Sequence, residues 1–244
     1  MDDTARFSLL TFNINDDATS ASSPAGWTLA AQHAALRQLV LEHSPDLLCL
    51  QECFSFPSTL VDHYDFHGST TSHRGSCHVA TRRGSALGAD GPTIAAGPCI
   101  LVPLRLGERR LFAASAHLAP FAEFDQERAR QLADIVRAVP ADVPLVLAGD
   151  TNMRERETGQ AAANGLADAW LESGSPPEQR WSVNTCVNRY FADGHAFTAR
   201  YDRLLYRGCT LLGFAVTADQ PCSDTPQHYL SDHFGLVASL RLDP

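Results

Sequence analysis

Two segments of the chain combine residue types that could carry out metal-assisted phosphate chemistry. Residues 145–152, Leu-Val-Leu-Ala-Gly-Asp-Thr-Asn, run an apolar strand into a glycine turn that presents Asp150 and Asn152. Residues 230–236, Leu-Ser-Asp-His-Phe-Gly-Leu, place an aspartate and a histidine just before another apolar run. Polar groups of these types at the ends of buried strands are typical of a metal-assisted phosphodiesterase site. We therefore expect an enzyme that acts on a phosphate ester.

Other apolar runs also end or begin at a polar side chain. These side chains are Asn13, Glu52, His117 and Asp202. Since the loops at strand ends gather into a common rim, we expect these groups to meet the two segments above. A hard divalent cation such as Mg²⁺, for which Mn²⁺ could substitute, prefers oxygen ligands. The expected metal ligands are Glu52 and Asn13, together with Asp232 acting through a water molecule.

The remaining polar groups suit the steps of a hydrolysis. Asp150 is the expected base for the attacking water, and the amide of Asn152 would hold Asp150 or a phosphate oxygen. Gly-Asp-Thr-Asn is also good turn chemistry that needs no catalysis, so this reading depends on the companion motifs. His117 and His233 would donate hydrogen bonds to the phosphate. Asp202 would orient one of these two imidazoles, and the sequence leaves open which one.

Substrate contacts are expected next to the same motifs. Trp181 and Tyr201 could stack on an unpaired base or on an aromatic leaving group, although an aromatic residue in a strand is by default a core residue. Arg200 and Arg203 flank Asp202; either could touch phosphate, and Arg203 could equally be a structural ion-pair partner. The expected substrate-binding residues are Trp181, Tyr201, Arg200, Thr151, Arg154 and Ser231.

Length and composition indicate one soluble domain. A chain of 244 residues with 44% hydrophobic content can bury one large core, so we expect residues 1–244 to form a single domain. The net charge of −9 disfavours broad binding of duplex nucleic acid, but it does not exclude a nucleic-acid enzyme with an acidic metal site. The acidic amino terminus lacks the pattern of a secretion signal, and no apolar run is long enough to span a bilayer. An odd number of cysteines, 7, without paired spacing predicts free thiols. We expect an intracellular protein.

The hydrophobic pattern predicts strands at the centre and helices outside. Expected strands cover residues 7–12, 46–51, 110–117, 145–150, 201–206, 211–216 and 235–242. Helical spacing covers residues 27–43, which Ser44-Pro45 ends, and residues 124–139, where Arg128, Leu132 and Ile135 recur. Residues 68–98 suggest short strands and loops, and residues 151–198 an irregular stretch. These elements predict an α/β fold in which a two-layered sheet sandwich is flanked by helices.

The motifs also occur in a familiar order. They are Thr11-Phe12-Asn13, Leu50-Gln51-Glu52, Ser115-Ala116-His117, Gly149-Asp150-Thr151-Asn152, Tyr201-Asp202-Arg203 and Ser231-Asp232-His233. This series resembles the endonuclease/exonuclease/phosphatase superfamily of metal-dependent phosphodiesterases across nearly the whole chain. The resemblance implies a DNase I-like, four-layered α/β sandwich, with two packed mixed β-sheets between helices.

Within that superfamily the chain is most similar to the branch that hydrolyses tyrosyl-DNA bonds. The similarity rests on residues 149–157, 168–170, 180–185, 199–203 and 231–236. It implies Mg²⁺-dependent hydrolysis of 5′-phosphotyrosyl-DNA bonds, which releases a 5′-phosphate end and repairs trapped topoisomerase 2 adducts. The expected partners are DNA 5′ ends that carry a tyrosine or peptide, single-stranded at that end. We further expect a monomer in the nucleus or the cytoplasm, without a membrane partner.

Two alternatives stay open. A related DNA or RNA endonuclease or exonuclease, or another phosphodiesterase that takes lipid or nucleotide esters, would use the same motifs. A noncatalytic interaction module is disfavoured, because a binding module does not need the whole polar set.

Departures from the family pattern concern the metal site. Asn15 stands where the family usually has an acidic residue, with Asp16 and Asp17 just beyond it. His117 is followed by Leu-Ala-Pro instead of Leu-Glu-Ser, and the segment between Glu52 and His117 is short.

Overall fold

Long apolar runs form the strands at the centre of the molecule. The computed structural model describes residues 5–16, 24–72, 75–191 and 195–244. The first sheet has 6 strands in the order β14-β15-β1-β2-β4-β3. Its strands are β1 (Arg6–Asn13), β2 (Leu47–Cys53), β3 (Tyr64–Ser72), β4 (Gly75–Arg82), β14 (Cys209–Thr217) and β15 (Gly235–Leu242).

A second sheet packs face to face on the first. It has the strand order β10-β13-β9-β8-β7-β5, and β6 (Ile94–Ala96) pairs with β7. Its other strands are β5 (Leu87–Ala89), β7 (Cys99–Leu106), β8 (Arg109–His117), β9 (Leu145–Asp150), β10 (Ala167–Asp168) and β13 (Asp202–Arg207). A small separate ladder joins β11 (Val183–Asn184) to β12 (Thr198–Ala199). Both large sheets mix parallel and antiparallel pairs, as the resemblance to the superfamily implied.

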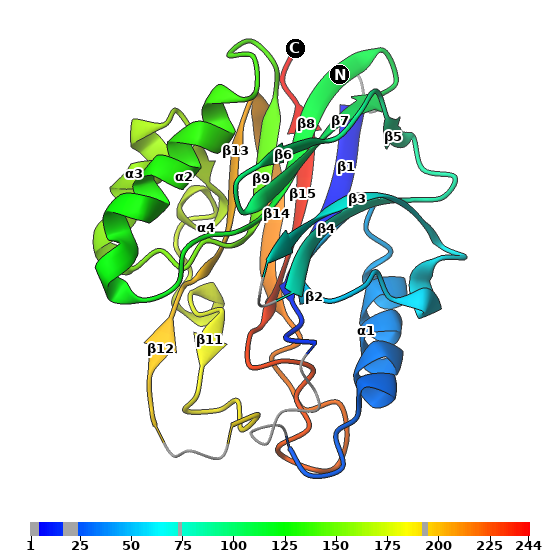
Figure 1. Ribbon diagram of the computed structural model, residues 1–244, viewed down its shortest axis with the longest axis vertical. Coiled ribbons are helices and arrows are strands. Elements are labelled where there is room, and N and C mark those ends of the chain that lie inside the picture. The colour runs from blue at the N-terminus through cyan, green and yellow to red at the C-terminus, as the bar shows by residue number, and fades with distance from the viewer. Residues whose placement is uncertain (1–4, 17–23, 73–74, 192–194) are drawn as a thin grey trace.

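The hydrophobic core has one layer between the sheets and one beneath each outer helix. Phe7 and Leu9 of the first sheet meet Val102 and Val146 of the second between the sheets. The helix α1 (Leu29–His43) covers the outer face of the first sheet, and α2 (Asp125–Arg137) covers the outer face of the second. Figure 1 shows these layers, with the short helices α3 (Gly159–Ala163) and α4 (Ala169–Glu172) on the side of α2. The predicted four-layered sandwich is confirmed, and the cysteines are free thiols as expected.

Local sequence sets the ends of α1. The hydroxyl of Thr28 accepts a hydrogen bond from the Ala31 N–H at 3.2 Å, so the helix begins just after Thr28 instead of at Trp27. It ends at His43, because the next residue, Ser44, adopts a left-handed φ of 44° and Pro45 prevents continuation. Among the helices in the described part of the chain, none is both long and apolar enough to cross a membrane.

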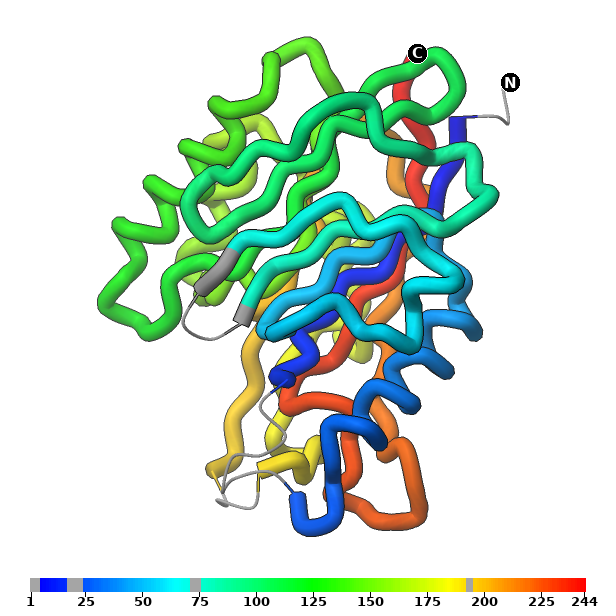
Figure 2. Tube along the Cα trace, turned by 45° about the vertical axis from the view of Figure 1, so that its right-hand side comes forward, coloured from blue at the N-terminus to red at the C-terminus, as the bar shows by residue number. Residues whose placement is uncertain are grey.

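Strand register brings the polar strand ends to one edge. In the first sheet, β1 and β2 run parallel and pair Asn13 with Gln51. In the second sheet, β8 and β9 run parallel and pair His117 with Asp150, while β13 runs antiparallel and pairs Asp202 with Asp150. Figures 1 and 2 show the loops beyond these strand ends gathered at the end of the sandwich opposite the chain termini.

Some elements were missed in the sequence. The strand β7 was not predicted; it contains Pro103, and proline is usually a sign against a strand interior. The stretch 151–198, expected to be irregular, contains α3, α4 and the short strands β10 and β11, with β12 beginning at its end. These strands are two residues long and exist because of their pairing partners, so no local pattern indicates them.

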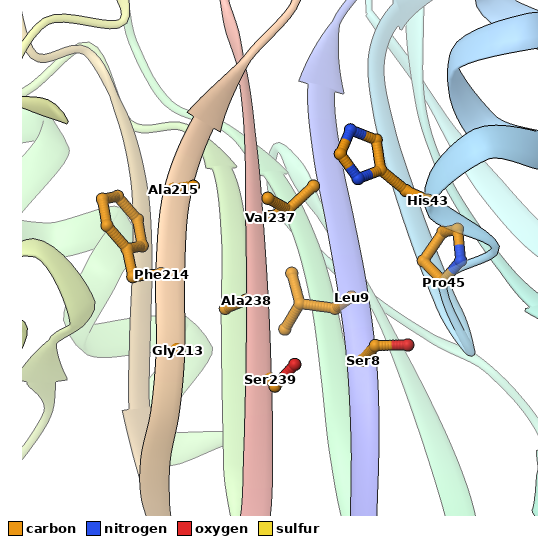
Figure 3. A pocket seen from close by; sticks show the side chains of 10 residues that line it. All are labelled: Ser8, Leu9, His43, Pro45, Gly213, Phe214, Ala215, Val237, Ala238 and Ser239. Carbon is orange, nitrogen blue, oxygen red and sulfur yellow. The ribbon is translucent and has the colours of Figure 1, made fainter.

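A hollow away from this edge lies along the middle of β1, β14 and β15. It has a volume of about 230 Å³ and adjoins the C-terminal end of α1. Figure 3 shows its lining, with the small residues Gly213 and Ala215 on one side of the hollow and His43 on the other.

Candidate active site

One buried amide joins two carboxylates at the centre of the edge. The side-chain nitrogen of Asn13, at the end of β1, donates to Glu52 Oε1 at 3.1 Å and to Asp150 Oδ2 at 3.1 Å. The ligand atoms of Glu52, His117 and Asp150 lie within 4.8 Å of one another. The two sheets thus contribute one carboxylate each to a group that could hold a metal ion.

Backbone geometry directs Glu52 to this centre. Glu52 has a left-handed φ of 49°, and its carbonyl accepts the N–H of Asp16 at 2.9 Å. Burial raises the pKa of its carboxyl group, and the positive charge of His117 offsets this effect only in part. A divalent cation would favour the charged form of such a carboxylate, so the donor chemistry suits a metal ligand.

Asp150 is fixed by the turn that follows β9. The backbone N–H of Asn152, which has a φ of 51°, donates to Asp150 Oδ1 at 2.9 Å. The side-chain amide of Asn152 instead donates to the Leu118 carbonyl at 3.2 Å. The backbone of Asn152 therefore holds Asp150 in place of its side-chain amide, and the alternative contact of this amide with a phosphate oxygen stays a prediction.

Two imidazoles flank the carboxylates. His117 Nε2 lies 3.5 Å from Asp150 Oδ2 and 3.6 Å from Glu52 Oε1. His233 Nε2 lies 4.0 Å from the same Asp150 oxygen, and its Nδ1 lies 2.7 Å from Asp202 Oδ2. Asp202 therefore orients His233, which answers the question that the sequence left open.

The charge of His233 follows from its surroundings. Burial alone would lower the pKa of His233, but the charges of Asp202, Asp232 and Asp150 together raise this pKa well above its ordinary value. These carboxylates therefore favour the imidazolium form of His233, whose Nε2 faces Asp150 Oδ2 at 4.0 Å.

Asn15 occupies the place beside Asp232. Its side-chain nitrogen donates to Asp232 Oδ1 at 2.9 Å, and its backbone N–H donates to Asn13 Oδ1 at 3.1 Å. The oxygen of Asn13 that a metal would need is thus engaged with Asn15. Asp16 does not replace the acidic residue, because its carboxylate accepts from Phe54 N and lies 2.9 Å from His33 Nε2. Asp17 lies outside the described residues.

Aromatic and arginine side chains pair near this edge. The guanidinium of Arg154 lies over the Tyr201 ring, 4.9 Å from its centre. Arg180 lies in the same way over Trp181 at 4.2 Å. Trp181, Tyr201 and Arg154 keep partly exposed side chains, so they could reach a substrate. Their substrate-binding roles stay predictions.

Other expected substrate-binding residues lie in the interior. Arg200 is buried and donates to Asp168 Oδ2 at 2.6 Å. Thr151 is buried and its hydroxyl donates to the Tyr201 carbonyl at 2.7 Å. Ser231 is buried and its hydroxyl donates to Asp232 Oδ1 at 3.2 Å. These side chains hold loops and neighbouring groups in place, and their expected substrate-binding roles stay predictions.

Three further contacts under the site were not expected from the sequence. The Ser182 hydroxyl accepts the Asp202 N–H at 2.9 Å, and its carbonyl accepts the Phe234 N–H at 2.6 Å, so Ser182 holds both sides of the Asp202–His233 pair. Between the sheets, Gln51 Nε2 donates to Ser115 Oγ at 2.9 Å. Gln51 and Ser115 could have been found in the sequence, because each is a polar residue at an inward position of an apolar strand. Ser182 has no such signal in the sequence.

The layered fold and the polar edge define the class of DNase I-like α/β sandwich proteins, and comparison with known families gives the narrower assignment. The sequence profile of the Endonuclease/Exonuclease/phosphatase family matches residues 10–233. The chain belongs to this family.

Its relatives include the branch expected from the sequence. Tyrosyl-DNA phosphodiesterase 2 of Xenopus laevis is 26% identical over 141 residues, a match that covers 52% of this chain and 37% of the frog protein. The chain thus spans well under half the length of this relative.

Among solved structures, D. rerio TDP2 complexed with single-strand DNA product has a TM-score of 0.79 at 18% identity, covering 97% of this chain and 99% of that one. The human Nocturnin catalytic domain has a TM-score of 0.72 at 18% identity, covering 99% of this chain and 96% of that one. These structures share the fold, and the resemblance to the tyrosyl-DNA phosphodiesterase branch is confirmed.

Proposed function

We propose that this chain is a divalent-metal-dependent phosphodiesterase that hydrolyses 5′-phosphotyrosyl bonds of DNA. The observation that carries the proposal is the pair of carboxylates, Glu52 and Asp150, joined by Asn13 and flanked by His117 and His233. A simple turn or a cluster of surface charges would not bring polar side chains from both sheets together in this way. Residues 1–244 would act as one catalytic domain.

The donor set fits a hard cation. Glu52 would hold Mg²⁺, or Mn²⁺ in its place, with Asp232 acting through a water molecule. The ligand role of Asn13 stays a prediction, since its side-chain oxygen accepts from Asn15. A bound cation would neutralise charge on the phosphate and on the leaving oxygen.

The chain's own residues account for the remaining steps. Asp150 Oδ2 would take the proton of a water molecule that attacks phosphorus in line, while the Asn152 N–H keeps the Asp150 carboxylate oriented. The imidazolium of His233 and the ring of His117 would donate hydrogen bonds to the phosphate oxygens. A tyrosine phenolate, whose conjugate acid has a pKa of about 10, leaves readily, so no dedicated acid is required.

The choice of DNA as substrate rests on the relatives. The curated relatives are tyrosyl-DNA phosphodiesterases, and D. rerio TDP2 holds a single-stranded DNA product on the same fold. The Arg154–Tyr201 and Arg180–Trp181 pairs could stack on unpaired bases or on the tyrosine. The partner would be a DNA 5′ end with a tyrosine or peptide adduct, as left by a trapped topoisomerase 2, and the enzyme would act as an intracellular monomer.

The first test compares DNA ends. We would measure Mg²⁺-dependent release of tyrosine from single-stranded DNA with a 5′-phosphotyrosine, beside 3′-phosphotyrosyl DNA, unmodified DNA and an abasic duplex. Cleavage confined to the 5′-tyrosyl end, and abolished by EDTA, is expected. Cleavage of ordinary or abasic DNA would reassign the enzyme to the nucleases of the family, and no cleavage would direct attention to lipid or nucleotide esters.

Substitution of the carboxylates tests the site itself. Glu52→Gln and Asp150→Asn should each lower kcat/KM by at least about 100-fold, because they remove a metal ligand and the base respectively. The control is Glu108→Gln in the exposed turn between β7 and β8. Wild-type activity in either site variant, with circular dichroism showing an unchanged fold, would refute the assignment.

A further inference from the structure

The loops that follow His117 and Asp150 are tied together at two places. The first tie lies directly beside the catalytic centre. The Leu118 N–H donates to the Asp150 carbonyl at 2.9 Å, and the side chain of Asn152 donates back to the Leu118 carbonyl at 3.2 Å. Each loop thus fixes the other where its catalytic side chain begins.

The second tie is a buried ion pair farther along the loops. Arg128 in α2 donates through Nε to Glu157 Oε2 and through Nη2 to Glu157 Oε1, both at 2.8 Å. The side chains are 1% and 6% exposed. Glu157 Oε1 also accepts the N–H of Arg154, so the carboxylate holds its own loop as well as the arginine.

Arg128 also holds the other loop. Its Nη1 donates to the carbonyls of Ala119 at 2.9 Å and Phe121 at 2.6 Å. Gln131, one turn further along the same face of α2, accepts the Ala119 N–H at 2.9 Å. Phe121 has a φ of 66°, a conformation that a phenylalanine rarely adopts unless its surroundings impose it.

Stability alone does not explain this arrangement. A buried ion pair is commonly no more stabilising than apolar side chains of similar volume, although breaking one partner is costly. Its directional hydrogen bonds fix geometry in a way that apolar contacts do not. The Arg128–Glu157 pair contacts none of the carboxylates or imidazoles of the site. It nevertheless connects the loop that follows His117 to the loop that follows Asp150.

The geometry points to Arg128 and Glu157 as positioning residues that hold His117 at the correct distance from Asp150 for phosphodiester hydrolysis. This inference rests on the proposed function. The separation to be kept is the 3.5 Å between His117 Nε2 and Asp150 Oδ2. A displacement of about 1 Å in a catalytic group can cost about 100-fold in rate.

The decisive variant is Arg128→Met combined with Glu157→Leu. It removes the pair without leaving a buried charge but leaves the carbonyls of Ala119 and Phe121 without Arg128, so we expect the domain to fold with a moderately lowered thermal midpoint. We expect kcat to fall by about 10- to 100-fold and KM to change by less than about threefold, because positioning acts in the transition state. A stable variant with wild-type kcat would overturn the proposal.

A more conservative variant and a matched control are measured beside the double variant. Arg128→Lys keeps the charge but cannot make the two-pronged contact and also hold the carbonyls, so kcat should fall here too. Arg207→Lys is the control, because Arg207 donates to the carbonyls of Val139 at 3.0 Å and Pro140 at 2.8 Å, beyond the other end of α2. It should leave kcat unchanged, and an equal loss in both lysine variants would show that no special role attaches to Arg128.

A readout without substrate separates this inference from the proposed function. Hydrogen–deuterium exchange should rise in residues 118–124 and 153–158 of the double variant, and in residues 138–144 of Arg207→Lys. If the wild type cleaves no tyrosyl-DNA, the proposed function fails, and the rates are then compared on an activated phosphodiester such as bis(p-nitrophenyl) phosphate. Unchanged exchange in both loops refutes the positioning role whatever the enzyme hydrolyses.

Discussion

The imidazole of His233 lies among three carboxylates, of which Asp202 is the nearest at 2.7 Å. Because their charges raise the pKa of His233, the proton stays on the ring well above the ordinary value of about 6.5. Because the folded state holds this proton more tightly than the unfolded state, protonation of His233 also stabilises the fold. The stabilisation is complete below the ordinary pKa of histidine and is lost as the pH rises through the raised pKa of His233. Activity that needs the imidazolium should likewise fall as the pH rises through the raised pKa of His233.

Replacing Asp202 should therefore lower the pH above which activity is lost. In Asp202→Asn the imidazole loses its main countercharge, so the descending limb of kcat/KM should shift toward about pH 6.5, with at least a 10-fold loss near pH 8. A pH–rate profile measures this shift, with Asp219→Asn in an exposed loop as the control. An unshifted descending limb would mean that another group sets the alkaline limit.

At the scale of single residues, the sequence predicted which groups meet but not all that they do. Asn13, Glu52 and Asp150 converge as their strand-end positions indicated. Arg200 carried the same kind of signal, yet the structure pairs it with Asp168, a residue 32 positions away in the chain. The partner of a polar side chain is set by tertiary packing, which a local motif does not contain.

The strand β9 reaches the site through a close approach to its neighbour. Gly149 has a φ of 145°, and a Cβ there would collide with the carbonyl oxygen of Ala116 in β8 and approach the side chain of Gln51. Only glycine lets β9 lie this close and still deliver Asp150 to the edge.

Gly149→Ala should therefore destabilise the protein. We expect a loss of about 1–3 kcal/mol in the free energy of unfolding, from backbone strain and overpacking. Urea denaturation measures this loss. Gly159→Ala is the matched control, because its Cβ would meet open space at the start of α3, and it should be neutral or slightly stabilising. Equal stability of both variants would contradict the argument.

Elements with strong local patterns were predictable and those that depend on partners were not. β2 is buried along nearly its whole length, so its continuous apolar run marked it clearly. β7 is also apolar, but Pro103 masked it. Helix α2 was located correctly, and an arginine on its inward face, at the spacing of Leu132 and Ile135, was a signal that Arg128 must have a buried partner.

For the whole molecule, the carboxylate centre couples metal binding to folding. A cation that binds at Glu52 only in the folded state stabilises that state by mass action. At an ion concentration about 100 times Kd, Mg²⁺ or Mn²⁺ should add about 2.7 kcal/mol, which corresponds to roughly 5–10 °C in Tm for a chain of this size.

Thermal unfolding with and without the ion measures this effect. Glu52→Gln should lose most of the shift, whereas Glu108→Gln should keep it. If Glu52→Gln and the wild type gain equally from the ion, the cation binds elsewhere, and the ligand assignment is wrong even if the protein is an enzyme.

The arrangement of the layers followed from the sequence only in outline. Alternating strand and helix patterns, with the resemblance of the motifs, predicted a sandwich of two sheets between helices. They did not predict that β15 inserts between β14 and β1, because strand order is a property of contacts between distant segments. The strand ends were still placed at one edge, since each motif lay at the end of its own apolar run.

Asn15, Glu52 and Asn152 all adopt left-handed backbone conformations, with φ of 44°, 49° and 51°. A residue with a Cβ in this region costs about 1 kcal/mol relative to glycine. A directed-evolution experiment that selects for thermal stability would therefore favour glycine at these three positions. Such variants would be relieved of backbone strain but would lose the side chains of the proposed site, so selection for heat resistance alone would remove the proposed activity.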